Sequence, residues 1–183
     1  QPMRLKNVPY APEVIDASPF VAAEPEKNRG HWQDVFAREA PLHIEIGMGK
    51  GQFLLAMALQ HPDISYIGIE KFPSVLLRAV QKQDERQLAN IRLLCLYAEK
   101  LPEIFAPGEI SRIYLNFSDP WPKDRHAKRR LTAPAFLHCY EQLLAPDGSL
   151  EMKTDNRALF DYSLETLAAC GWELTSVTRD LHR

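Results

Sequence analysis

Three of the eight glycines stand close together, directly after an apolar run. Gly47, Gly49 and Gly51 fall within five residues and follow Leu42–Ile46, a run typical of a buried strand. Glycine lets the backbone turn sharply and lets a ligand approach without a Cβ in the way. In open α/β sheets, ligands bind in the crevice at the carboxyl ends of the strands. The spacing therefore predicts a ligand-binding turn between a strand and a helix.

A carboxylate ends the next apolar run. Glu70 stands about 20 residues beyond the glycines, where an acid can accept hydrogen bonds from both hydroxyls of a ribose. A dinucleotide-binding G-x-G-x-x-G turn would have its third glycine at position 52, which is Gln52. Glu45, the alternating glycines and the later acid together resemble the cofactor site of Rossmann-like S-adenosylmethionine methyltransferases. The pattern predicts a nucleoside cofactor and does not choose the reaction.

A stiff acidic loop follows the fourth apolar run. In the stretch 116–131, Pro120 and Pro122 fix φ on both sides of Trp121, which rigidifies the segment at little folding cost. Asp119 is therefore expected to face the ligand crevice as a rigid acid beside an aromatic ring. Trp121 could stack on a base or pack beneath the loop, and both readings stay open.

Strong positive charge follows this acid. The eight residues 123–130 contain five cations and one acid, Asp124, in a chain whose formal net charge is −2. Clustered Lys and Arg bind phosphates, so the patch predicts contact with a nucleic acid; the alternative is a solvated charged face. The expected phosphate contacts include Arg125, His126, Arg129 and Arg130.

No metal site and no membrane segment are expected. The other histidines show no ligand spacing, and Cys95, Cys139 and Cys170 lie far apart, as expected for buried small residues in a reducing compartment. The sequence shows no cleavable signal and no run of about 18 apolar residues. The cytoplasm is the expected compartment.

Alternating apolar runs and amphipathic stretches indicate the elements that hold these residues. Strands are expected at 42–46, 64–69, 91–96, 110–117, 149–153 and 172–178. Helices are expected up to Gln60, from Pro73, after an N-cap at Thr132, and around 160–168. The alternation predicts an α/β fold: a doubly wound, mostly parallel sheet with helices on both faces, in one domain of residues 31–183. Residues 1–30 hold five of the fourteen prolines and are expected to form a flexible N-terminal arm.

The loop from Asp119 to Leu131, with Lys153-Thr154-Asp155-Asn156, resembles the bacterial tRNA (guanine-N7)-methyltransferase family. Family-like elements recur along nearly the whole chain, at 3–4, 45–47, 66–70, 114–131, 153–162 and 180–182. The resemblance implies S-adenosylmethionine as cofactor, no metal, and tRNA as partner, with guanine 46 of the variable loop methylated at N7. It leaves open whether the protein is a monomer or a homodimer.

The same resemblance implies individual roles. Glu45 and Glu70 hold the cofactor, Asp119 lies at the catalytic centre, and Lys123 and Asp155 contact the target nucleotide. An alternative for Asp155 is that it only caps the last helix. The complete set of expected residues is Glu45, Gly47, Gly49, Glu70, Tyr97, Ala98 and Asp119 for the cofactor, and Lys123, Arg125, His126, Arg129, Arg130 and Asp155 for the tRNA.

Two positions depart from the family pattern. Where the family commonly has an acid near the adenine, this chain has Tyr97, so either backbone atoms or Glu99 make that contact. The family also continues past Asp180-Leu181-His182 with a T-x-Y-E-like segment that helps hold the guanine, and with a final strand. This sequence ends at Arg183, so either it is incomplete at its C-terminus or the protein lacks part of the substrate pocket.

The chemistry needs alignment more than proton transfer. Guanine N7 carries a free lone pair, so Asp119 is expected to orient the base and offset its developing positive charge rather than abstract a proton. Three alternatives remain: a methyltransferase for exocyclic amines, whose motif differs from Ser118-Asp119-Pro120-Trp121 at one residue; a nicotinamide oxidoreductase, disfavoured by Gln52; and an RNA-binding protein without activity.

Overall fold

The alternating apolar runs form one sheet and its covering helices in the computed structural model, which describes residues 7–177. The strands are β1 (Leu42–Ile46), β2 (Ser65–Ile69), β3 (Ile91–Leu94), β4 (Ile110–Asn116) and β5 (Leu144–Lys153). The α-helices are α1 (Ala11–Ala17), α2 (Trp32–Val35), α3 (Gln52–Gln60), α4 (Pro73–Arg86), α5 (Leu101–Ile104), α6 (Pro134–Leu143) and α7 (Arg157–Ala169). Short 3₁₀ helices are η1 (Pro25–Asn28), η2 (Ala98–Lys100) and η3 (Asp124–Arg129).

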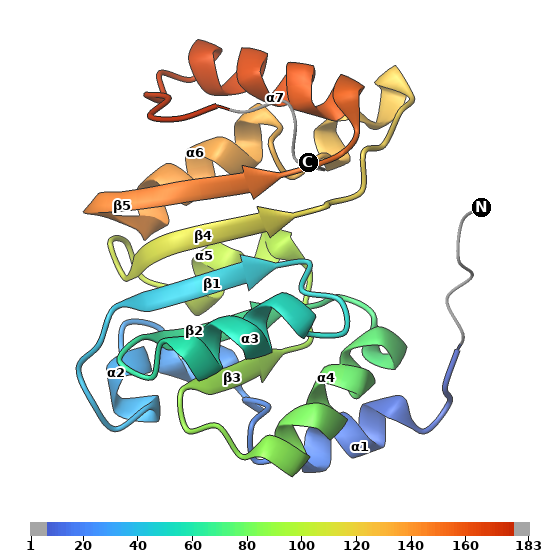
Figure 1. Ribbon diagram of the computed structural model, residues 1–183, viewed down its shortest axis with the longest axis vertical. Helices are drawn as coiled ribbons and strands as arrows, with labels where there is room; N and C mark the ends of the chain where they lie inside the picture. Colours follow the sequence, from blue (N-terminus) through green and yellow to red (C-terminus); the bar gives the residue numbers. More distant parts are fainter. Residues whose placement is uncertain (1–6, 178–183) are drawn as a thin grey trace.

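The sheet has the order β3-β2-β1-β4-β5, and every paired strand runs parallel to its neighbour. The chain therefore winds outward from β1 to β3 and then crosses back to place β4 on the other side of β1 (Figure 1). Such a reversal opens a crevice at the carboxyl ends of the two strands, here β1 and β4. The predicted doubly wound α/β fold is confirmed.

Two apolar clusters fill the spaces between the sheet and its helices. One cluster joins the sheet to α1, α3 and α4, and the other joins it to α2, α5 and α6 (Figure 1). All five positions of β1 and of β2 are buried, as expected for central strands covered on both faces. Trp32, the largest fully buried side chain, donates its indole N–H to the Ile104 carbonyl at 2.9 Å, so its polar atom is satisfied within the core.

The segment expected to form an N-terminal arm contains α1, which packs against α4. Ala11 and Ile15 of α1 are buried. Farther along, the Leu93 N–H donates to the Phe20 carbonyl at 2.8 Å, which ties this segment to the outer side of β3. Its flexibility in solution stays a prediction.

Two local expectations are wrong. Thr132 does not cap α6, because its hydroxyl lies 2.6 Å from Ser163 Oγ on α7 and the N-cap residue is Ala133. The strand expected at 172–178 does not form over residues 172–177, and Thr178 lies outside the described residues. A strand needs a pairing partner, and residues 172–177 have none in the part of the chain that the structure describes.

Candidate active site

A cavity of about 830 Å³ opens where β1, β2, β3 and β4 end. Glu70, after β2, and Asp119, after β4, both lie in its wall. The wall also contains four more of the residues expected from the sequence, namely Gly47, Tyr97, Ala98 and Arg129. The structure therefore brings the two key carboxylates into one space.

The glycine turn depends on its glycines in two different ways. Gly47, Gly49 and Gly51 have φ of +77°, +59° and +84°, the left-handed region that other residues rarely adopt. A Cβ added at Gly47 or Gly49 would meet nothing within 4 Å, so these two leave open space for a ligand. A Cβ at Gly51 would lie 2.9 Å from the Ala79 Cβ, so the third glycine allows α3 to pack closely on α4.

The carboxylate of Glu70 braces the glycine turn. Its Oε1 accepts the Gly49 N–H at 3.1 Å, and its Oε2 accepts the Phe72 N–H at 2.9 Å. Each carboxylate oxygen has a second lone pair, so these bonds leave acceptor capacity toward the cavity. The residue thus fits a group with two hydroxyls, as expected for a ribose.

Glu45 is more deeply buried, with 2% of its surface exposed. Asn116 Nδ2 donates to Glu45 Oε2 at 3.0 Å, whereas Glu45 Oε1, Asn116 Oδ1 and Ser118 Oγ lack a hydrogen-bond partner among the described residues. Burial raises the pKa of Glu45 to about 7; the Asn116 hydrogen bond opposes this rise, and the nearby Glu70 charge adds to it. These atoms are placed to receive donors from a ligand or from water.

The loop that carries Asp119 is strained on both sides of that acid. Phe117 and Trp121 have φ of +54° and +43°, and they are two of the four described non-glycine residues with positive φ. Such residues cost roughly 1–3 kcal/mol each and persist only where neighbours hold them. The loop begins with the Phe117 N–H donating to the Lys153 carbonyl at 2.8 Å, which anchors it to β5.

The buried side chain of Arg130 holds the other end of the Asp119 loop. Its guanidinium donates to the Pro120 carbonyl at 3.2 Å and to the Trp121 carbonyl at 3.0 and 2.8 Å, and it lies 4.5 Å from the centre of the Tyr162 ring. Only 9% of Arg130 is exposed. The expected phosphate contact at this position is therefore replaced by a contact that shapes the loop.

Trp121 lies in the cavity wall with cations around its ring. The Arg129 guanidinium lies 5.0 Å and the Lys71 ammonium 5.7 Å from the ring centre, and His126 meets the ring edge-on at 5.5 Å. Lys71 also lies 5.9 Å from the Tyr97 ring. The ring borders the cavity instead of being packed wholly beneath the loop.

The remaining expected tRNA contacts lie outside the cavity wall, as far as the structure describes them. Lys123 and Arg125 are exposed around η3. Asp155 is exposed two residues after Lys153, which pairs with Asn116, so it leaves the sheet beside the start of the Asp119 loop. It does not cap α7, because the cap is Asn156, whose side chain accepts the Leu159 N–H at 2.8 Å.

The chain resembles known proteins over most of its length. Residues 39–182 match the protein family described as "Putative methyltransferase". A relative from Lachnoclostridium phytofermentans, named tRNA (guanine-N(7)-)-methyltransferase, is 55% identical over 98% of this chain and 84% of its own length. The chain belongs to the tRNA (guanine-N7)-methyltransferase family. The resemblance noted in the sequence is confirmed.

Solved structures of lower identity share the fold of this methyltransferase. The 16S rRNA methyltransferase KamB is 14% identical, with a TM-score of 0.63 over 80% of this chain and 76% of that one. Haemonchus contortus phosphoethanolamine N-methyltransferase 2, solved in complex with S-adenosyl-L-methionine, is 15% identical, with a TM-score of 0.50 over 92% of this chain and 38% of that one. Both likenesses show a Rossmann-like methyltransferase fold.

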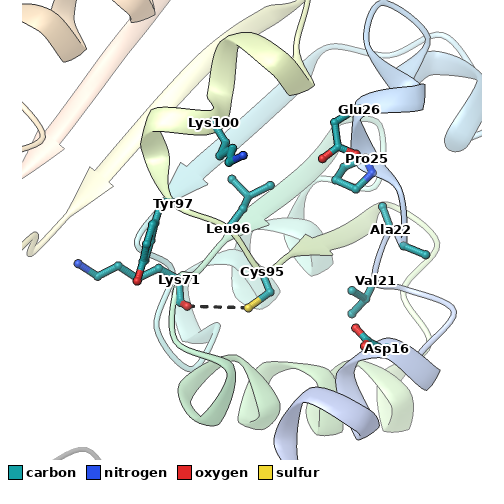
Figure 2. A pocket seen from close by; sticks show the side chains of 11 residues that line it. Asp16, Val21, Ala22, Pro25, Glu26, Lys71, Cys95, Leu96, Tyr97 and Lys100 are labelled. Carbon is teal, nitrogen blue, oxygen red and sulfur yellow. Dashed lines mark hydrogen bonds between the residues drawn. The ribbon is translucent and has the colours of Figure 1, made fainter.

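A second cavity of about 460 Å³ adjoins the active site of this methyltransferase. It lies between the segment after α1 and the loop after β3, and it shares Lys71, Leu96 and Tyr97 with the larger cavity (Figure 2). Cys95 in its wall is exposed rather than buried as expected, and its thiol lies 3.9 Å from the Lys71 carbonyl. Sequence reasoning missed Lys71; its position directly after the predicted ribose acid was the available signal.

No group of three or more His, Cys, Asp or Glu side chains in residues 7–177 could hold a metal ion. None of the helices described there has the length and apolar character needed to cross a membrane.

Proposed function

We propose that this tRNA (guanine-N7)-methyltransferase takes its methyl group from S-adenosylmethionine and places it on guanine 46 of the variable loop. One observation carries the proposal: Glu70 and Asp119 line the same cavity at the point where the strand order reverses. In this proposal Glu70 binds the ribose of the cofactor and Asp119 orients the guanine, and their shared cavity supports both roles. The family to which the chain belongs supports tRNA as the substrate.

The cavity wall fits the proposed cofactor. Glu70 would receive the ribose hydroxyls of the cofactor. The turn at Gly47 and Gly49 leaves room for close approach of the cofactor's amino-acid part, which bears the sulfur. On the β3 side, Ala98 lies in the wall next to Glu99, so the backbone there or the Glu99 carboxylate would hold the adenine in place of the acid that Tyr97 replaces.

The protein's own contribution is alignment. S-adenosylmethionine supplies a methyl group already activated by a sulfonium. Asp119 orients the edge of the guanine and offsets the positive charge that moves onto the purine as the bond forms. Because N7 has a free lone pair, no residue must first remove a proton. Arg130 and the Lys153 carbonyl hold the Asp119 loop in place, which keeps the geometry productive.

The basic residues beside the cavity provide the tRNA contact. Lys123, Arg125, His126 and Arg129 belong to or border η3, which follows the Asp119 loop directly. Phosphates bound there would bring the target base toward the cavity, where Asp155 is the second orienting acid. We expect the enzyme to act in the cytoplasm, as a monomer or a homodimer.

The test is the product formed on unmodified tRNA. The wild-type protein should convert guanine 46 to 7-methylguanosine with labelled S-adenosylmethionine, detected by mass spectrometry of the digested nucleosides. Asp119→Ala should still bind S-adenosylhomocysteine but lose turnover. Asp124→Ala, which removes an exposed acid of η3 outside the cavity wall, should keep turnover.

Three results would contradict the proposal. Full turnover by Asp119→Ala would show that the catalytic centre does not lie in this loop. A methylated exocyclic amine in the product would favour the alternative chemistry. Unchanged methylation of a transcript with adenine at position 46 would show that another nucleotide is the target.

A further inference from the structure

Buried polar atoms without partners gather at the floor of the active site. Five buried side-chain N or O atoms lack a hydrogen-bond partner among the described residues, and three of the five belong to Glu45, Asn116 and Ser118. These residues stand where β1 and β4 end as neighbouring strands. Because buried polar groups are normally satisfied, three orphans at one junction indicate that a partner binds there.

The contact between two of these residues determines what that partner can be. Asn116 Nδ2 donates to Glu45 Oε2 at 3.0 Å, which fixes the amide so that Asn116 Oδ1 is its remaining acceptor. Glu45 Oε1 is a carboxylate oxygen, and the Ser118 hydroxyl can also accept. A site of acceptors suits a group that only donates, and a primary ammonium has three N–H donors and no acceptor.

The junction adjoins the proposed cofactor cavity. Ile46 and Phe117, the residues that follow Glu45 and Asn116, lie in the cavity wall, and Ser118 lies in it too. Gly47 adds a wall position where even a Cβ would meet nothing within 4 Å. A ligand that fills the cavity can therefore place one end against these atoms.

We propose that Asn116 is a positioning residue, which holds the Glu45 carboxylate in the orientation that receives the primary ammonium group at the amino-acid end of the cofactor. This rests on the proposed function, which makes S-adenosylmethionine the cofactor. Asn116 acts on the ligand through Glu45 and through its own carbonyl oxygen. Ser118 supplies the third acceptor.

The role makes cofactor binding depend on pH. Burial raises the pKa of Glu45 to about 7, the Asn116 hydrogen bond opposes that rise, and the charge of the Glu70 carboxylate, which follows β2, adds to it. On β4, Tyr114 is the residue in register with Glu45, and its phenol is neutral at these pH values. An ammonium needs the ionised carboxylate, so affinity should fall as pH drops below 7, and loss of the Asn116 donor should move that fall to higher pH.

The experiment compares two ligands across pH on the full chain. S-adenosylhomocysteine keeps the ammonium, and its deaminated analogue replaces the ammonium by hydrogen; both are titrated calorimetrically from about pH 6 to pH 9 against wild type, Asn116→Ala and Asn116→Ser. At pH 7, Asn116→Ala should bind S-adenosylhomocysteine roughly tenfold to a hundredfold more weakly, the range for a lost hydrogen bond to a charged group. This difference in affinity between wild type and Asn116→Ala should narrow toward pH 9. The analogue should bind all three proteins alike, without pH dependence.

The outcomes separate this role from the proposed function. If wild type binds neither ligand, the cofactor itself is wrong. If wild type binds both ligands equally, no ammonium is received at this junction, and the inference fails while the proposed function stands; this comparison needs no variant. If the Asn116 variants weaken both ligands by the same factor, the residue is merely structural and the inference is again overturned.

Discussion

The two sides of the active site reach unusual backbone conformations by different means. On the β1–β2 side, the residues with positive φ are Gly47, Gly49 and Gly51, for which this region carries no Cβ penalty. On the β4 side they are Phe117 and Trp121, which do carry it. The β1–β2 side, where we propose that the cofactor binds, is thus shaped by residue type, and the β4 side, where we propose that the tRNA binds, is shaped by contacts made elsewhere in the fold. We refer to them as the cofactor side and the substrate side.

The difference places the supports of each side in different parts of the chain. The glycine turn is held by the adjacent strand β2, because the Gly47 and Met48 N–H groups both donate to the Ile69 carbonyl, at 2.8 and 3.0 Å. The Asp119 loop is held by Arg130 and by the Lys153 carbonyl of the adjacent strand. We therefore expect changes on the cofactor side to act on folding, and changes on the substrate side to act on turnover.

The largest effect should come from Gly51→Ala on the cofactor side. The new Cβ would lie 2.9 Å from the Ala79 Cβ at a residue whose φ is +84°, so backbone strain and overpacking add together. We expect the free energy of unfolding to fall by about 3 kcal/mol. Gly49→Ala has strain without a clash and should cost about 1 kcal/mol. Urea denaturation measures both; equal losses in the two variants would show that packing against α4 does not matter.

A change of pH should also act on the cofactor side. The folded-state pKa of Glu45 is raised from 4.5 to about 7, so its contribution to stability is present below pH 4.5 and is lost as pH rises to 7. Without ligand, Glu45→Gln should match wild type near pH 4 and exceed its free energy of unfolding by about 3 kcal/mol at pH 8. Denaturation at both pH values tests this, with the exposed Asp124→Asn as control. Parallel stability curves for Glu45→Gln and wild type would refute it.

The cofactor side was also the more predictable from sequence. β1 forms over Leu42–Ile46 as expected, and α3 ends at Gln60 as expected, because a central parallel strand is a continuous apolar run and a glycine cluster marks its end. The meeting of Glu70 with Asp119 followed from topology, since the carboxyl ends of parallel strands share one edge. The local sequence pattern and the shared edge of parallel strand ends were sufficient to predict the cofactor side.

What sequence could not supply was the direction of individual side chains. Arg129 and Arg130 are adjacent and chemically alike, yet one is exposed and the other is buried against loop carbonyls. Thr132 has the composition of an N-cap, but a serine 31 residues away on α7 takes its hydroxyl. Each outcome depends on a partner distant in sequence, and no periodicity encodes that partner.

On the substrate side, Arg130→Ala should lower kcat by about a hundredfold, because a loop released from its three guanidinium hydrogen bonds misplaces Asp119. Binding of S-adenosylhomocysteine should stay within about threefold of wild type, since the glycine turn is held separately. Arg130→Lys should not restore turnover, because an ammonium lacks the planar fork that reaches both carbonyls. Steady-state methylation of tRNA measures kcat for both variants. An unchanged kcat in Arg130→Ala would contradict the claim that changes on the substrate side act on turnover.

The smallest effect separates the two neighbouring arginines. Arg129 is exposed at the cavity mouth, so Arg129→Ala should weaken tRNA binding by about tenfold or less and reduce the slope of log affinity against log salt by about 1. The slope of Arg130→Ala should equal that of wild type, because a guanidinium bonded to protein carbonyls releases no counterions. Filter binding over a salt series, with catalytically inactive Asp119→Ala as the common background, measures the slopes without turnover. Equal reductions in both variants would place Arg130 on the phosphates after all, and would mean that the loop opens when tRNA binds.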